Sequence, residues 1–309
     1  MAEPQHVPVL LEQSLNFLNV RAGGVVVDCT LGFGGHSAAI ARRLGAGGKL
    51  ICFDRDEQAM ELAKARLAKL AEELGAGSAN GMPQVEYVAR PFSEIAEVVE
   101  PGTLDGLLAD FGVSSMQLDE AHRGFSFRSD GPLDMRMDTR GGLTAEQVVN
   151  QADEEDLANL IYEFGEERRS RRIARAIVRA RPVTTTAELA RVISAVAPPI
   201  KKSDRGHGSG GQIHPATRTF QALRIRVNDE LGEIQSLLKS AGSLLKPEGR
   251  VVLISFHSLE DRLVKDSFRE SARLGELEIL TKKPVTASEE ESLRNPRSRS
   301  AKLRAAEKV

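Results

Sequence analysis

Short apolar runs alternate with helical patterns over the first 112 residues. Runs rich in Val, Leu and Ile predict strands at Val25–Asp28, Leu50–Phe53, Val85–Val88 and Asp105–Asp110. Between them, one helix is expected from about Ser37 to Leu44, and another carries apolar residues at 3- and 4-residue spacing until Gly75. Continuous apolar strands separated by helices indicate a parallel sheet that is covered on both faces.

The pattern changes after the fourth run. From about 120 to 216 it predicts helices and loops but no strand, with capping boxes at Thr144–Gln147 and Thr185–Glu188. Residues 199–216 are rich in Gly and polar residues and predict a mobile loop.

Strand and helix patterns return after residue 216. An amphipathic helix is expected over Val227–Leu245, a buried strand over Arg250–Phe256, a helix capped by Ser258, and an edge strand over Leu277–Thr281. The prediction is a discontinuous α/β domain of residues 1–120 and 217–309, with a helical insertion of residues 121–216.

The composition is that of a globular protein. Of 309 residues, 41% are hydrophobic and 28% charged, which excludes collagen-like, disordered and membrane classes. Cys29 and Cys52 fall in neighbouring strands and are expected to be buried thiols. Because cysteine is sparse and neither a signal peptide nor a long apolar run is evident, a cytoplasmic protein that does not span a membrane is expected.

A glycine-rich turn follows the first strand. Gly32, Gly34 and Gly35 would let the backbone approach a ligand, and His36 follows them directly before the next helix. Asp54 ends the second strand, where a carboxylate can accept hydrogen bonds from both hydroxyls of a ribose. Turn and acid predict an adenosine-containing cofactor, either NAD(P) or S-adenosylmethionine. The spacing departs from G-x-G-x-x-G, which favours S-adenosylmethionine.

Polar residues also end the fourth and fifth strands. Asp110 lies at the carboxyl end of the fourth strand, which opens onto the ligand crevice of such sheets. An acceptor there would hold the N–H groups of an amine during methylation. His257 ends the fifth strand and faces the same crevice, so it either bonds the substrate or is structural.

Several segments together match one family. They are His6–Leu11, Gly32–Ser37, Asp110–Asp119, Gly124–Phe127, Gly131–Asp138, His214–Arg224, Ser255–Arg262 and Arg297–Arg304. On these segments, nearly the whole chain resembles the bacterial 16S ribosomal RNA cytosine-N4 methyltransferases, the RsmH (MraW) family. The resemblance implies a Rossmann-like S-adenosylmethionine-dependent methyltransferase fold with an inserted all-helical domain for substrate recognition.

The same resemblance implies an activity and its residues. The acceptor would be N4 of a cytidine in the decoding centre of 16S ribosomal RNA, within the small ribosomal subunit, and a homodimer is implied. The resemblance places cofactor contacts at seven positions: Gly34, Gly35, His36, Asp54, Phe92, Asp110 and Gln117. The glycine-rich turn adds Gly32 as an eighth candidate. Asp110 and His257 are the candidate catalytic residues, and no metal is expected.

The net charge of −2 hides an uneven distribution. Residues 151–167 carry seven acids and no base, whereas residues 168–181 carry seven arginines and no acid. A helical stripe of Arg168, Arg171, Arg172 and Arg175, together with Arg179, would either track RNA phosphates or form a solvated face paired with the acidic helix. Arg218 and Arg224 are further candidates for RNA contacts. The basic C-terminus predicts a disordered arm that orders on RNA.

Phenylalanines offer a slot for a single base. Phe111, Phe125 and Phe127 would hold a flipped cytosine; packing in the core is the alternative, and it is favoured most for Phe111. Two other functions stay open on the residues alone: an NAD(P)-dependent oxidoreductase, and a non-catalytic RNA-binding protein.

Overall fold

The chain divides into two compact units in a computed structural model. The structure describes all residues except 1–7, 76–80, 198–199 and 202–211. The sheet unit comprises Met1–Gly112 and Leu231–Val309, and the helical unit comprises Val113–Glu230. These boundaries differ from the predicted ones, because α5 (Ser115–Asp119) and α10 (Thr217–Asn228) belong to the helical unit.

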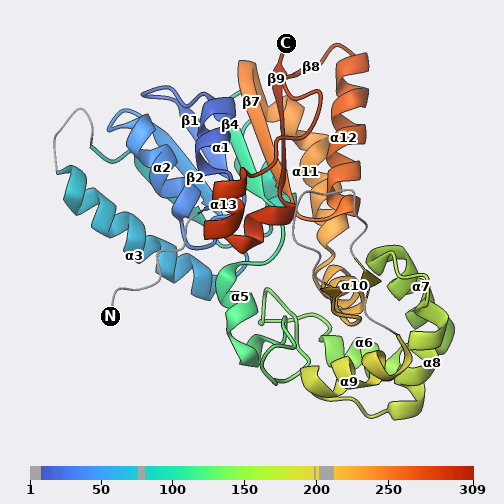
Figure 1. Ribbon diagram of the computed structural model, residues 1–309. Coiled ribbons are helices and arrows are strands. Elements are labelled where there is room, and N and C mark those ends of the chain that lie inside the picture. Colours follow the sequence, from blue (N-terminus) through green and yellow to red (C-terminus); the bar gives the residue numbers. More distant parts are fainter. Residues whose placement is uncertain (1–7, 76–80, 198–199, 202–211) are drawn as a thin grey trace. The chain divides into compact units, whose positions relative to one another are not determined.

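A seven-stranded sheet organises the sheet unit, with the strand order β3-β2-β1-β4-β7-β9-β8. The strands are β1 Val25–Asp28, β2 Lys49–Phe53, β3 Gln84–Val88, β4 Leu104–Asp110, β7 Leu245–Ser255, β8 Leu277–Ile279 and β9 Lys302–Lys308. The first five strands of that order are parallel, and β9 runs antiparallel to β7 and β8. The predicted Rossmann-like α/β fold, including an edge strand near residue 277, is confirmed (Figure 1).

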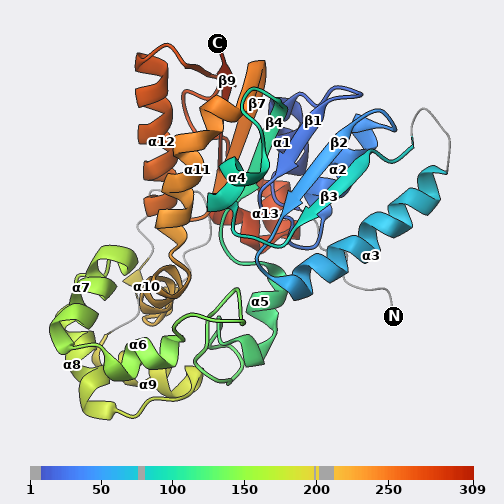
Figure 2. The same ribbon diagram turned by 180° about the vertical axis from the view of Figure 1, so that it is seen from behind.

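Helices cover both faces of this sheet. One face packs against α1 Leu11–Leu18, α2 Gly35–Leu44 and α3 Glu57–Leu74. The other packs against α4 Ile95–Val98, α11 Glu230–Leu244 and α12 Ser258–Arg273 (Figure 2). Neighbouring residues of one strand enter opposite cores, as Val26 and Val27 do in β1. Cys29 and Cys52 are buried free thiols, as predicted.

The C-terminus is a strand, and the prediction of a disordered arm is wrong. β9 lies between β7 and β8, where Leu303, Ala305 and Ala306 are fully buried. Arg304 is buried with them, and its Nε donates to Asp261 Oδ1 at 2.7 Å. Apolar residues alternate with the basic ones in this segment, and the strands with which they pair are distant in the sequence. α13 (Glu289–Arg294) and a 3₁₀ turn (Pro296–Ser300) lie directly before β9 in the sequence.

The single helix expected over Val227–Leu245 is two helices. α10 ends at Asn228, because Asp229 adopts a left-handed conformation with φ 48°. α11 then ends at Leu244, where β7 begins, ahead of Pro247. Among the residues that the structure describes, no helix is long and apolar enough to span a membrane.

The helical unit has its own core, which Ile161, Ile173 and Leu189 help to form. Its other helices are α6 Ala145–Gln151, α7 Glu154–Gly165, α8 Ser170–Ala180 and α9 Thr186–Val196. The capping boxes predicted at Thr144 and Thr185 are confirmed. A short antiparallel pair, β5 Ile200–Lys201 and β6 Gln212–Ile213, departs from the expectation of no strand. Most of the predicted mobile loop lies outside the described residues.

Candidate active site

The glycine turn connects β1 to α2, which begins at Gly35, two residues earlier than expected. Gly32 and Gly34 have φ of 48° and 70°, in the left-handed region that favours glycine. At Gly35 an added Cβ would lie 2.5 Å from Pro8 Cγ, so Pro8 packs directly on the turn. Among the residues that the structure describes, no side chain caps α2. Its first N–H groups therefore suit a polar ligand.

Asp54 closes the turn from the end of β2. Its Oδ2 accepts the Gly32 N–H at 2.8 Å, and its Oδ1 accepts the Asp56 N–H at 2.9 Å. Burial raises the pKa of Asp54 to about 6, although these two hydrogen bonds act in the opposite direction. Asp56 caps α3. The carboxylate of Asp54 therefore both shapes the turn and titrates near neutral pH.

Asp110 ends β4 beside the same turn. Its backbone N–H donates to Thr30 Oγ1 at 2.7 Å, and its Oδ1 is buried with no hydrogen-bond partner in the described part of the chain. Burial, followed by the charges of Asp28 and Glu260, raises the pKa of Asp110 well above its ordinary value. Asp110 thus offers a buried acceptor oxygen that the described protein groups leave for a ligand.

His36 faces Asp110 from the first turn of α2. Its Nδ1 lies 3.9 Å from Asp110 Oδ2, and its Nε2 lies 3.1 Å from the Val9 carbonyl oxygen. Because burial lowers the pKa of His36 to about 4, the ring is neutral at pH 7.

Asp28, at the end of β1, is a neighbour that the sequence analysis did not single out. It accepts the Ser37 hydroxyl at 2.6 Å and the Thr30 N–H at 3.1 Å, and burial raises its pKa. Its only signal in the sequence was an acid at a strand end.

Two phenylalanines stand near the end of β4. Phe92 opens a 3₁₀ turn (Phe92–Glu94), is half-buried, and has its ring centroid 5.9 Å from that of Phe111. Phe111 is buried in the core, directly after Asp110. The predicted cofactor contact Phe92 thus lies against the residue that follows Asp110.

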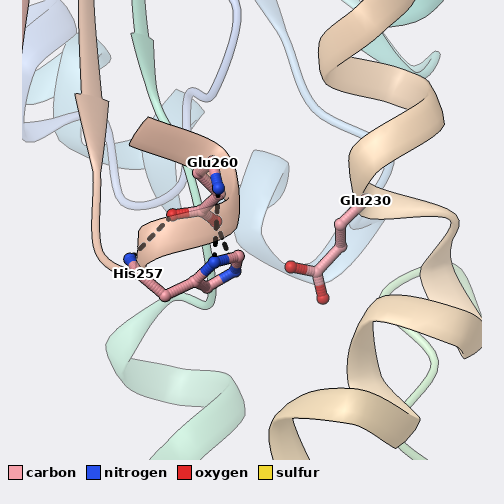
Figure 3. Close-up of side chains that lie close together, drawn as sticks. All are labelled: Glu230, His257 and Glu260. Carbon is pink, nitrogen blue, oxygen red and sulfur yellow. Dashed lines mark hydrogen bonds and ion pairs between the residues drawn. The ribbon is translucent and has the colours of Figure 1, made fainter. Parts of the chain in front are cut away.

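His257 caps α12, so the prediction of Ser258 as the cap is wrong (Figure 3). The His257 Nδ1 accepts the Glu260 N–H at 3.4 Å, and Nε2 lies 3.2 Å from Glu260 Oε1. The other carboxylate oxygen of Glu260 accepts the Phe256 and His257 N–H groups. An imidazole cap replaces the usual hydroxyl, and these contacts favour the structural interpretation of His257.

The predicted base-binding and cofactor residues of the helical unit are also engaged locally. Gln117 is buried and forms a capping box with Ser114. Phe125 is buried in the helical core. Phe127 is half-buried, with its ring 4.5 Å from that of His214 and edge-on to Phe220 at 4.8 Å. Core packing therefore accounts for Phe125 better than for Phe127.

The arginine stripe is exposed on α8 and just before it. Arg168, Arg171 and Arg172 show no ion pair in the described ranges, whereas Arg175 Nε lies 3.2 Å from Glu154 Oε1. The expected alternative, pairing with the acidic helix, thus holds for one of the four. Arg218 donates to the Glu166 carbonyl, and Arg224 is held by both carboxylate oxygens of Glu230 at 2.7 and 2.8 Å.

Two glycine motifs of the helical unit serve packing. An added Cβ at Gly131 would lie 1.9 Å from the Ala121 carbonyl oxygen, and one at Gly124 would lie 2.3 Å from that of Pro132. Asn228 accepts the Met137 N–H and donates to the Met135 carbonyl. These segments are therefore built around close backbone contacts.

A profile of the MraW methylase family matches residues 3–309. The chain belongs to this family. The ribosomal RNA small subunit methyltransferase H of Acidobacterium capsulatum is 65% identical over 308 residues, covering 100% of both chains. That of Koribacter versatilis is 58% identical over 301 residues, covering 97% of this chain and 93% of the relative.

Solved structures are more distant. A putative methyltransferase of Streptococcus mutans in complex with SAH is 11% identical, covers 98% of this chain and 100% of its own, and has a TM-score of 0.44. Membership of the MraW methylase family removes the oxidoreductase alternative, since the family transfers methyl groups.

Proposed function

We propose that this protein transfers the methyl group of S-adenosylmethionine to N4 of a cytidine in the decoding centre of 16S ribosomal RNA. The observation that carries the proposal is the Asp110 Oδ1, a buried acceptor at the end of β4 without a partner among the described residues. It lies in a chain that belongs to the MraW methylase family and whose relatives are named for ribosomal RNA methylation.

The residues of the sheet unit fit the methyl donor. The glycine turn offers the uncapped N-terminus of α2, Asp54 offers a carboxylate for the ribose hydroxyls, and Phe92 offers an aromatic surface. Bound there, S-adenosylmethionine supplies a methyl group activated by its positively charged sulfur. We also propose that Gln117 contacts the cofactor and that the helical unit recognises the RNA.

Asp110 holds the amine that is methylated. Its carboxyl oxygen accepts an N–H of the cytosine amino group, which aligns the nitrogen with the methyl carbon. The new bond joins nitrogen to carbon, the carbon–sulfur bond breaks, and sulfur takes the electron pair. Because the amino group must then lose a proton, a carboxylate whose pKa is raised is suited to receive it.

Affinity for S-adenosylmethionine is expected to fall as the pH falls below about 6, the pKa of Asp54. The ribose hydroxyls donate to the ionised carboxylate, so binding releases a proton below that pH, and affinity drops by up to about tenfold per pH unit. Calorimetry in two buffers of different ionisation enthalpy measures both quantities. In Asp54→Asn the affinity is weaker and the dependence disappears. A wild-type affinity that is flat across this range would contradict the assignment.

The arginine stripe of α8 is expected to bind phosphates. Replacing Arg168, Arg171 and Arg172 by Ala should weaken binding to the small subunit about tenfold or more and flatten its salt dependence, because fewer counterions are released. Affinity for S-adenosylmethionine should not change. Arg273→Ala is the matched control, since Arg273 is exposed on α12 and pairs with Glu270. Equal salt slopes for the triple variant and wild type would refute the phosphate contacts.

The acceptor is tested by mapping modified cytidines. Small subunits from a strain that lacks the gene should lose one N4-methyl cytidine mark in the decoding centre, and the purified protein should restore it. Binding of S-adenosylmethionine and RNA without transfer on any assembly state would favour the non-catalytic RNA-binding alternative. A cytoplasmic location and a homodimer remain predictions that accompany this function.

A further inference from the structure

The His6–Leu11 motif has no role in the function proposed above, and its described part packs on the glycine turn. We propose that Pro8–Leu10 forms an N-terminal strap, anchored by Glu291, that sets which nitrogen of His36 faces Asp110. The inference rests on the proposed function only in that S-adenosylmethionine binds at this turn. Glu291 and the Val9 carbonyl would then be positioning groups, acting on the site through His36.

Glu291 anchors the strap from α13. Its Oε1 accepts the Leu10 N–H at 2.7 Å, across 281 residues of sequence. Leu10 is fully buried and adopts a left-handed conformation with φ 52° and ψ 36°. A leucine rarely adopts this conformation, and its buried N–H needs an acceptor, so the hydrogen bond that Leu10 donates to Glu291 stabilises the conformation and satisfies the N–H.

Val9 carries the constraint to His36. A carbonyl oxygen only accepts hydrogen bonds, so the 3.1 Å contact between the Val9 oxygen and Nε2 places the imidazole proton on Nε2. The pKa of about 4 keeps the ring neutral at pH 7. The lone pair is consequently on Nδ1, the nitrogen that lies 3.9 Å from Asp110 Oδ2.

A lone pair on His36 Nδ1 that faces the Asp110 carboxyl group restricts which chemical groups of a ligand can bind between the two side chains. Two acceptors repel each other unless a proton is shared, so His36 and Asp110 together suit a group that donates N–H. An ammonium or amino group of a ligand has this chemistry. If the proton moved to Nδ1, the ring would donate to Asp110 and compete with such a ligand.

The test compares three variants of the full-length protein. Glu291→Ala removes the acceptor, and Glu291→Gln keeps an acceptor carbonyl without the charge. Glu290→Ala makes the same charge change at an exposed neighbour that pairs only with Arg294 among the contacts described. Two quantities are measured: the ¹⁵N chemical shifts of the His36 ring, which report the position of its proton, and calorimetric affinity for S-adenosylmethionine.

Wild type, Glu291→Gln and Glu290→Ala should all hold the proton on Nε2 and bind with similar affinity. Glu291→Ala should show a mixture of the two ring forms and bind about tenfold more weakly. A merely structural role for Glu291 would lower the melting temperature and leave the ring form and the affinity unchanged, which would overturn the proposal.

Other outcomes are equally decisive. If Glu291→Ala does not fold, Glu291→Gln decides: an altered ring form or weaker binding in that folded variant refutes a hydrogen-bond anchor, and wild-type behaviour supports it. If wild type does not bind S-adenosylmethionine, the proposed function fails. If wild type binds and Glu291→Ala binds equally well, only the strap fails.

Discussion

Asp110→Asn is expected to lower methyl transfer by about a hundredfold or more while the protein stays folded, because it removes the group that receives the proton of the amine. Asparagine has nearly the same shape as aspartate. The substitution also removes a carboxyl group whose ionisation is opposed by burial and then by the charges of Asp28 and Glu260. The melting temperature should therefore be unchanged or higher. Transfer of a tritiated methyl group to small subunits that lack the mark measures the loss.

Controls separate this effect from a loss of binding. Affinity for S-adenosylmethionine in Asp110→Asn should fall far less than transfer does. Asp266→Asn makes the same chemical change at an exposed carboxylate on α12, beside Lys265, and should transfer at the wild-type rate. Undiminished transfer by Asp110→Asn would remove Asp110 from the reaction and leave it, at most, a cofactor contact.

A chain that ends at Ala301 is expected not to fold. It lacks β9, which hydrogen-bonds to β7 on one side and β8 on the other. Three fully buried side chains and the buried Arg304–Asp261 pair go with it. Such a loss is of the same order as the roughly 5–15 kcal/mol by which domains are stable. Far-UV circular dichroism and size-exclusion chromatography should show an unfolded or aggregated chain.

The matched control for this truncation removes only Val309, which is 70% exposed. That chain should melt within a few degrees of wild type, since surface changes rarely exceed about 0.5 kcal/mol. A soluble chain ending at Ala301 with a cooperative melting transition would show that the sheet tolerates β7 as an edge, contrary to the role assigned to β9.

Local patterns were enough to predict most of the sheet and its turn. β1, β2 and β4 are continuous apolar runs, and the capping boxes at Thr144 and Thr185 are made by residues three positions apart. β9 escaped prediction because its burial depends on partners far away in sequence. In the sequence alone, Lys302 and Arg304 among Leu303 and the alanines resemble a basic tail. The structure shows that both basic side chains donate to Asp261, which lies about 40 residues earlier.

The positions of the site residues could be predicted from the sequence, but the contacts between them could not. The turn, Asp54 and Asp110 each end or follow a strand, and parallel strands bring such residues to one edge. The Val9 contact of His36 could not be foreseen, because it uses a backbone carbonyl 27 residues away. Arg224 shows a similar limit: the sequence offered it as a candidate for RNA contacts, whereas its pairing with Glu230 depends on the left-handed break at Asp229.

The position of β9 has a consequence for the order in which the protein acquires its structure during synthesis. β9 is an interior strand of the sheet but comes after all the other strands in the sequence, so β7 keeps an unpaired edge until residues 302–308 have been synthesised. The helical unit, Val113–Glu230, is continuous in the chain and has its own core. We therefore expect the helical unit to fold before β9 has been synthesised, and the seven-stranded sheet to be completed only afterwards.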